Sequence, residues 1–181
     1  MIIIRGREEL VGPLAGTRQD GNEEEPMIAL KRILLPTDFS EYSAAARNYA
    51  CAFCDQFHSE LHLLHVIQDL APLAPEPGVM LPPPPDYLKE IEENATLMLE
   101  RVLDPQWAAG KTIVRVVRQG PPFLEIVRYA KEAGIDLIVI GTHGRTGLAH
   151  VFMGSVAEKV VRKSPCPVLS VRHPEHEFIA P

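Results

Sequence analysis

The sequence has few cysteines, no long apolar run and no excess of basic residues. Three cysteines, an odd number, do not make a disulfide framework and indicate a cytoplasmic protein with reduced thiols. No segment approaches the roughly 18 apolar residues of a membrane span, and the opening MIIIRGREEL lacks the apolar centre of a signal peptide. The net charge of −6 argues against nucleic acid as a partner, because attraction to phosphates needs a basic surface. These absences predict a cytoplasmic protein that binds neither a membrane nor nucleic acid.

The 181 residues suffice for one domain with a hydrophobic core, and the composition adds a tail at each end. Residues 1–26 include GPLAGTRQDGNEEEP, which is rich in glycine, proline and acids without a period, so we expect a flexible N-terminal extension. The domain is expected over residues 27–173 and a C-terminal tail over 174–181. Two alternatives are open at the start: Met27 is the true translation start, or MIIIR adds a short edge strand.

Strand-like and helix-like patterns alternate along this domain. Apolar runs predict five strands, at residues 31–37, 60–67, 111–119, 136–141 and 166–171. Four helices are expected between them, at residues 40–58, 86–103, 120–134 and 155–164. Ser40 is expected to cap the first helix and Gly134 to follow the end of the third. The alternation predicts an α/β fold: a five-stranded parallel, doubly wound sheet of order 3-2-1-4-5 with helices on both faces.

The second predicted helix, residues 86–103, has an apolar stripe at helical spacing. Its expected buried face consists of Leu88, Ile91, Ala95, Met98 and Val102.

In a doubly wound sheet the ligand crevice lies beyond the carboxyl ends of the strands where the winding reverses, here between strands 1 and 4. The first strand is followed by the tripeptide PTD, and the fourth by the glycine-rich residues 141–155. Asp38, when ionised, accepts hydrogen bonds and suits a ribose hydroxyl, an adenine amino group or a hydrated metal ion. His65 and Val66, at the end of the second strand, are placed to face an adenine ring.

The glycine-rich segment GTHGRTGLAHVFMGS lies between a buried strand and a helix. Gly141, Gly144 and Gly147 can adopt positive φ and present backbone N–H groups without interference from a Cβ, which suits an anion. Gly154 and Ser155 are expected to open the helix, whose N-terminus attracts phosphate.

The pattern G-x2-G-x9-G-[ST], followed by VAEKVVRKSPCPVLSVR, resembles the universal stress protein family, as do RILLPTDFSEYSAAA, LHLLHV and DLIVIGTHGRTG. The resemblance covers about residues 27–172 and is to the ATP-binding branch, since another branch lacks the glycines. It implies ATP or another adenine nucleotide as ligand, optionally with Mg²⁺. Adenosine would contact Pro36, Thr37 and Asp38, and the main chain of Val66 would bind the adenine edge. By the same resemblance, the residues around ribose and phosphates would be Gly141, Gly144, Arg145, Gly154, Ser155 and Val156.

Cys51 and Cys54 form a C-x-x-C pair with His58, His62 and His65 downstream, which suggests a zinc or redox site. The cysteines lie in the middle of a predicted helix, whereas a redox pair needs a helix N-terminus to lower the thiol pKa. His62 and His65 point to opposite faces of their strand and cannot converge on one metal. A buried Cys54 is the favoured interpretation, and we assign no metal ligand.

Two further features leave alternatives open. His143 and His150 are either phosphate ligands or bases of the loop, or solvated surface residues. The proline-rich residues 72–85 form either a stiff connector or a rim over the adenine side. The glycine spacing is neither a P-loop nor the dinucleotide fingerprint, which belongs after the first strand.

The predicted function is a nucleotide-dependent stress-response regulator or sensor, with at most slow hydrolysis and no assigned catalytic residue. The alternatives are a slow nucleotidyl- or phosphoryl-transfer enzyme and a nucleotide-independent interaction module. The last strand is an apolar edge, so we also expect a homodimer through residues 166–171, principally Val168, Leu169, Ser170 and Val171.

Overall fold

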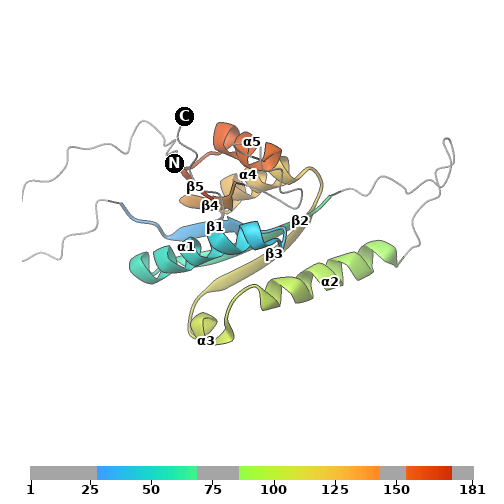
Figure 1. Ribbon diagram of the computed structural model, residues 1–181, viewed down its shortest axis with the longest axis horizontal. Helices are drawn as coiled ribbons and strands as arrows, with labels where there is room; N and C mark the ends of the chain where they lie inside the picture. The colour runs from blue at the N-terminus through green and yellow to red at the C-terminus, as the bar shows by residue number, and fades with distance from the viewer. Residues whose placement is uncertain (1–27, 69–85, 143–153, 173–181) are drawn as a thin grey trace, which may run out of the picture.

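The computed structural model describes residues 28–68, 86–142 and 154–172, and its centre is one parallel sheet (Figure 1). The strand order is β3-β2-β1-β4-β5, and every neighbouring pair is parallel, which confirms the predicted fold class. The strands are β1 (Arg32–Pro36), β2 (Glu60–Ile67), β3 (Ile113–Gln119), β4 (Leu137–Gly141) and β5 (Val168–Val171). The winding reverses between β1 and β4, where Ile33 is in register with Leu137.

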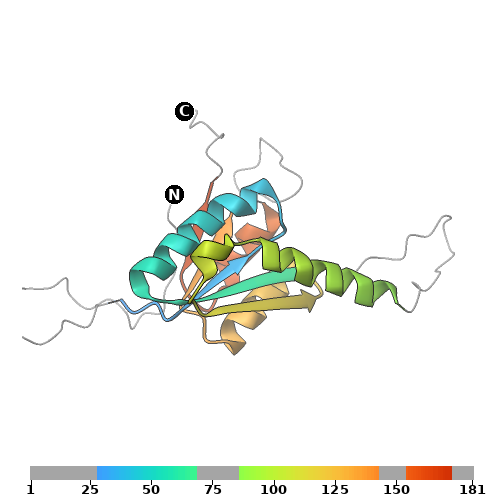
Figure 2. The same cartoon turned by 90° about the horizontal axis from the view of Figure 1, so that it is seen from below.

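Helices cover both faces of the sheet. Figures 1 and 2 show α1 (Glu41–Phe57) and α2 (Tyr87–Arg101) on one face, and α4 (Pro122–Glu132) and α5 (Ser155–Lys163) on the other. The sequence did not predict the short α3 (Pro105–Ala108). The Asp104 carboxylate starts it by accepting hydrogen bonds from the N–H groups of Gln106 and Trp107.

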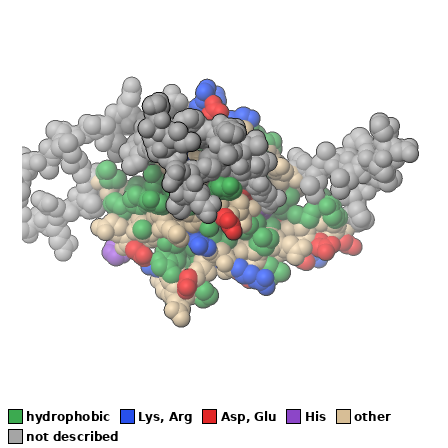
Figure 3. Space-filling model, viewed as in Figure 1, with side chains coloured by type: hydrophobic (Ala, Val, Ile, Leu, Met, Phe, Trp, Pro, Cys, Tyr) green, Lys and Arg blue, Asp and Glu red, His purple; other side chains and the backbone are tan. Residues whose placement is uncertain are grey.

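The core has two halves because successive strand side chains point to opposite faces. Leu34, Leu64 and Ile138 face α4 and α5, while Ile33 and Leu35 face α1 and α2, and all five are fully or almost fully buried. None of the helices in the described part of the chain is long and apolar enough to span a bilayer. On the surface drawn in Figure 3, apolar side chains are interspersed with charged ones of both signs.

The predicted helix caps are present. Ser40 is the N-cap of α1, and its hydroxyl accepts a hydrogen bond from the N–H of Ser43. Gly134 follows the C-cap of α4 with φ of 61°, the left-handed conformation that ends many helices.

The predicted buried face of α2 is wrong in part. Ala95 is buried as expected and Ile91 and Val102 are partly buried, but Leu99 takes the place of Met98 in the core. Leu88 is 44% and Met98 46% exposed. Helix α2 packs mainly against β2 and β3, and its first turns, which include Leu88, extend past the ends of the strands (Figure 2).

Several expectations fall on segments outside the described residues. These are the flexible extension 1–26, the proline-rich residues 72–85, the tail 174–181, and the loop residues Gly144, Arg145, Gly147, His143 and His150.

Candidate functional site

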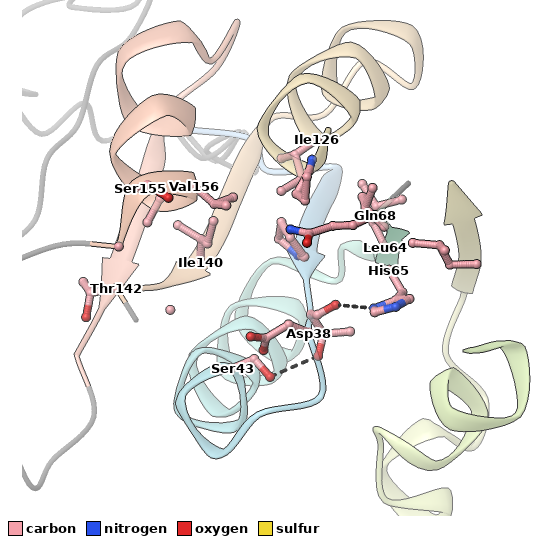
Figure 4. A pocket seen from close by; sticks show the side chains of 18 of the residues that line it. Asp38, Ser43, Leu64, His65, Gln68, Ile126, Ile140, Thr142, Ser155 and Val156 are labelled. Carbon is pink, nitrogen blue, oxygen red and sulfur yellow. Dashed lines mark hydrogen bonds between the residues drawn. The ribbon is translucent and has the colours of Figure 1, made fainter. Parts of the chain in front are cut away.

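A cavity of about 570 Å³ lies at the carboxyl ends of β1 and β4, where the winding reverses. Figure 4 shows Ser155 and Val156 of α5 on one side of it, and Asp38, Ser43 and His65 on the other. Every predicted site residue within the described part of the chain lines this cavity: Pro36, Thr37, Asp38, Val66, Gly141, Gly154, Ser155 and Val156. The structure thus brings together residues separated by more than 100 positions in the sequence.

Hydrogen bonds to β2 and α1 hold the loop between β1 and α1 at the carboxyl end of the sheet. The N–H of Thr37 donates to the carbonyl of Leu64 at 2.9 Å, and the Thr37 and Ser43 hydroxyls share a buried 3.0 Å hydrogen bond. The Thr37 carbonyl accepts a 2.8 Å hydrogen bond from Nδ1 of His65. Since a carbonyl only accepts, Nδ1 is the protonated ring nitrogen in this arrangement.

The carboxylate of Asp38 is oriented by Ser40. Both the backbone N–H and the hydroxyl of Ser40 donate to Oδ1 of Asp38, at 3.1 and 2.6 Å. Hydrogen bonds to a charged acceptor are short and strong, so this side chain has a defined direction at the cavity wall.

Phe39 has a positive φ of 65°, an uncommon conformation for a bulky residue. Its ring stacks on the imidazole of His65, with the ring centroids 4.3 Å apart. Backbone conformations of this kind persist where the surrounding contacts enforce them. The stack adds a second attachment between the loop and β2, beside the hydrogen bond to Thr37.

The start of α5 forms the opposite wall. Gly154 is the N-cap with extended backbone, φ of −63° and ψ of 149°, and its N–H donates to the Thr142 carbonyl at 2.6 Å. Ser155 is the first helical residue, as predicted. The backbone N–H groups of a first helical turn have no partner inside the helix, so this end of α5 suits an anion.

Gly141 does not use the positive φ that glycine allows. Gly141 lies in β4, and the described glycines with positive φ are Gly110, Gly120 and Gly134. A Cβ at Gly141 would lie 2.8 Å from the carbonyl oxygen of Tyr42 in α1. Glycine is required here because α1 approaches the strand closely, and not because the backbone is left-handed.

The cavity also contains residues that the sequence did not single out. Polar examples are Ser43, Gln68 and Thr142, and the apolar wall includes Ile91, Ile126 and Ile140. Thr142 and Gln68 directly follow the ends of β4 and β2. Their positions in the sequence could therefore have predicted that they line the cavity. Ile91 and Ile126 belong to helices, and only the packing of those helices brings them to the cavity.

The thiols and histidines of the C-x-x-C region do not form a site. Burial raises the pKa of Cys51 to about 11 and that of Cys54 to about 12, the reverse of a reactive thiol. His62 lies on the other face of β2 from His65, with Nδ1 2.6 Å from the Tyr129 hydroxyl. Burial lowers the pKa of His62. Within residues 28–68, 86–142 and 154–172, no cluster of three potential metal ligands occurs.

Comparison with known proteins gives consistent matches. The family model described as the universal stress protein family matches residues 29–172. Universal stress protein MJ0531 of Methanocaldococcus jannaschii is 35% identical over 153 residues, which covers 81% of this chain and 85% of that protein. The solved structure of the hypothetical protein MJ0577, from the same organism, has a TM-score of 0.65 at 31% identity, covering 82% of this chain and 99% of that one. A universal stress protein in complex with cAMP has a TM-score of 0.59 at 25% identity, covering 80% and 98% of the two chains.

Proposed function

The chain belongs to the universal stress protein family, and we propose that it is an ATP-binding member that acts as a nucleotide-dependent regulator or sensor in a stress response. One observation carries the proposal: an oriented carboxylate, Asp38, and a helix N-terminus, Gly154–Ser155, face each other across a cavity of about 570 Å³. That volume lies within the usual range of small-molecule sites, about 300–1,000 Å³. The homologue solved with cAMP holds a ligand of the same chemical class.

The two ends of the cavity suit the two ends of an adenine nucleotide. Asp38 would accept from ribose hydroxyls, and the main chain near Val66 would bind the adenine edge against the apolar wall formed by Ile91, Ile126 and Ile140. The phosphates would lie at the start of α5, where unpaired N–H groups and the helix dipole favour negative charge. Gly144, Arg145 and Gly147 would complete the phosphate site, with Mg²⁺ as an optional counter-ion.

The chemistry of the described cavity favours binding over turnover. Its ionisable side chains among the described residues are Asp38 and His65, and each is already engaged in the hydrogen bonds of the β1–α1 loop. Activation of a water molecule needs a base within hydrogen-bonding distance of that water. We therefore expect at most slow ATP hydrolysis.

Three further expectations belong to this proposal. The nucleotide-binding domain occupies residues 27–173 between two tails, and the protein acts in the cytoplasm. It forms a homodimer through β5, which is an edge strand of the sheet.

Native mass spectrometry of freshly purified protein, with and without added ATP, tests the nucleotide site. We expect bound adenine nucleotide in the wild type and loss of binding in Gly154→Val, because the side chain would occupy the space in front of the first turn of α5. Ala109→Val is the control: Ala109 is exposed, with a similar backbone conformation, φ of −59° and ψ of 126°, and does not line the cavity. If the wild type bound no nucleotide, or Gly154→Val bound it as well as Ala109→Val, the interaction-module alternative would replace the proposal.

A further inference from the structure

A second cavity, of about 310 Å³, lies between the beginning of α1 and the end of α2. Its apolar lining consists of Phe39 in the loop between β1 and α1, Met98 of α2 and Val102 at the C-cap of α2. Leu35 is also a lining residue but is fully buried. Its volume is at the lower end of the range for small-molecule sites, about 300–1,000 Å³. The nucleotide proposed for the first cavity does not account for it.

Two arginines, Arg47 and Arg101, are also among the lining residues, and no described acidic residue is. Nη1 of Arg47 donates a 2.8 Å hydrogen bond to the carbonyl of Val102, which ties α1 to the end of α2. Arg101 is exposed, in the last turn of α2. Because a guanidinium group has five N–H donors, the single hydrogen bond of Arg47 leaves most of its donor capacity for other acceptors.

We propose that this cavity binds a small amphiphilic monocarboxylate, with the apolar chain against Phe39, Met98 and Val102 and the carboxylate at Arg47 and Arg101. The apolar wall and the uncompensated positive charge together select this class over a neutral apolar molecule or a small inorganic anion. Arginine matches a carboxylate because its planar fork makes two parallel hydrogen bonds to the two oxygens.

The second cavity shares a wall with the nucleotide cavity. Thr37 and Ser43 line both, joined by their 3.0 Å hydrogen bond, and Ser40 lines the second while holding Asp38 at the first. Helix α2 also reaches both, with Ile91 at the first and Met98 at the second. We expect the carboxylate to change nucleotide affinity, a consequence that rests on the proposed function, whereas the carboxylate site itself does not.

Isothermal titration of the full chain, freed of nucleotide, with octanoate tests the site. We expect octanoate to bind and Arg101→Gln to weaken binding about tenfold, the effect of losing one charge-assisted hydrogen-bonding partner. Lys89→Gln removes the same charge from a 75% exposed side chain at the other end of α2 and is expected to leave octanoate affinity unchanged. 1-Octanol, which has the same chain without the charge, is expected to bind more weakly.

Three results would each contradict the carboxylate site. The first is that octanoate does not bind, and the second is that Arg101→Gln and Lys89→Gln bind octanoate equally well. The third is that the wild type binds 1-octanol as tightly as octanoate. A second titration, of ATP into protein saturated with octanoate, is expected to show at least about a fivefold change in ATP affinity, the lower end of typical coupling between sites. An unchanged ATP affinity would overturn the coupling alone. Failure of ATP to bind under any condition would instead overturn the proposed function and leave the octanoate result standing.

Discussion

The hydroxyl of Ser40 donates a 2.6 Å hydrogen bond to Oδ1 of Asp38 and accepts one from the N–H of Ser43 at 3.3 Å. Ser40 thus caps α1 and orients the carboxylate that faces the nucleotide cavity. The direction of Asp38 and the starting point of the helix are consequently set by the same side chain.

Ser40→Ala is expected to lower both stability and nucleotide affinity. Losing the cap should cost about 1 kcal/mol in the free energy of unfolding, and releasing Asp38 should weaken ATP binding several-fold. Chemical denaturation and ATP titration measure the two effects. Asp104→Ala removes the cap of α3, away from the cavity, and should lower stability without changing ATP affinity. Equal ATP affinities in the two variants would contradict the dual role of Ser40.

Gly141→Ala is expected to destabilise the fold by about 1–3 kcal/mol, because the new Cβ would overlap the Tyr42 carbonyl and force α1 away from β4. The midpoint of urea denaturation measures this loss. Gly110→Asn serves as the control, since no atom lies within 4 Å of a Cβ there and asparagine tolerates the φ of 75°. Wild-type stability in Gly141→Ala would show that α1 and β4 can separate at no cost.

Stability is expected to fall as the pH drops below about 6.5. Burial holds the pKa of His62 below its ordinary value of 6.5 in the folded protein, so the unfolded chain binds the proton first. The contribution of His62 is complete above the unfolded pKa and is lost on acidification, by at most about 1.4 kcal/mol per pH unit. Urea denaturation between pH 7.5 and 5.5 should show a shallower loss in His62→Gln. His58→Asn, at an exposed residue, should follow the wild type.

All three thiols are expected to react slowly with a thiol reagent in the folded protein at pH 8. Burial raises the pKa of Cys51, Cys54 and Cys166, so little of the reactive thiolate is present. Spectrophotometric titration with Ellman's reagent should show fast reaction of all three only after unfolding in urea. Fast labelling of Cys51 and Cys54 in the folded state would revive a redox function for the C-x-x-C pair.

Sedimentation velocity is expected to show a dimer for the wild type and a monomer for Leu169→Lys. A lysine on an edge strand disfavours pairing with a second chain. Val114→Lys places the same residue on β3, the opposite edge of the sheet, and should remain dimeric. A monomeric wild type at micromolar concentration would exclude the homodimer.

Local signals were sufficient for much of the fold. The bounds of β2, the cap at Ser40 and the glycine after α4 follow from apolar runs, hydroxyl capping and a residue that tolerates positive φ. The parallel, doubly wound class followed from the alternation of strands and helices, and the expected order 3-2-1-4-5, which brings Asp38 and Gly154 to one cavity, is the observed one. These features depend on neighbouring residues or on chain connectivity, both of which can be derived from the sequence.

Only the tertiary structure decided how the helices and strands pack against one another. It replaced Met98 by Leu99 in the core, because the position of α2 on β2 and β3 sets which side of the helix is buried. It showed that glycine is needed at position 141 because the Tyr42 carbonyl lies so close, and not because of the backbone conformation. It also revealed a second cavity, lined by Arg47 and Arg101. Each depends on the distance and rotation between two elements, which arise from packing many side chains at once and leave no periodic trace in the sequence of either element.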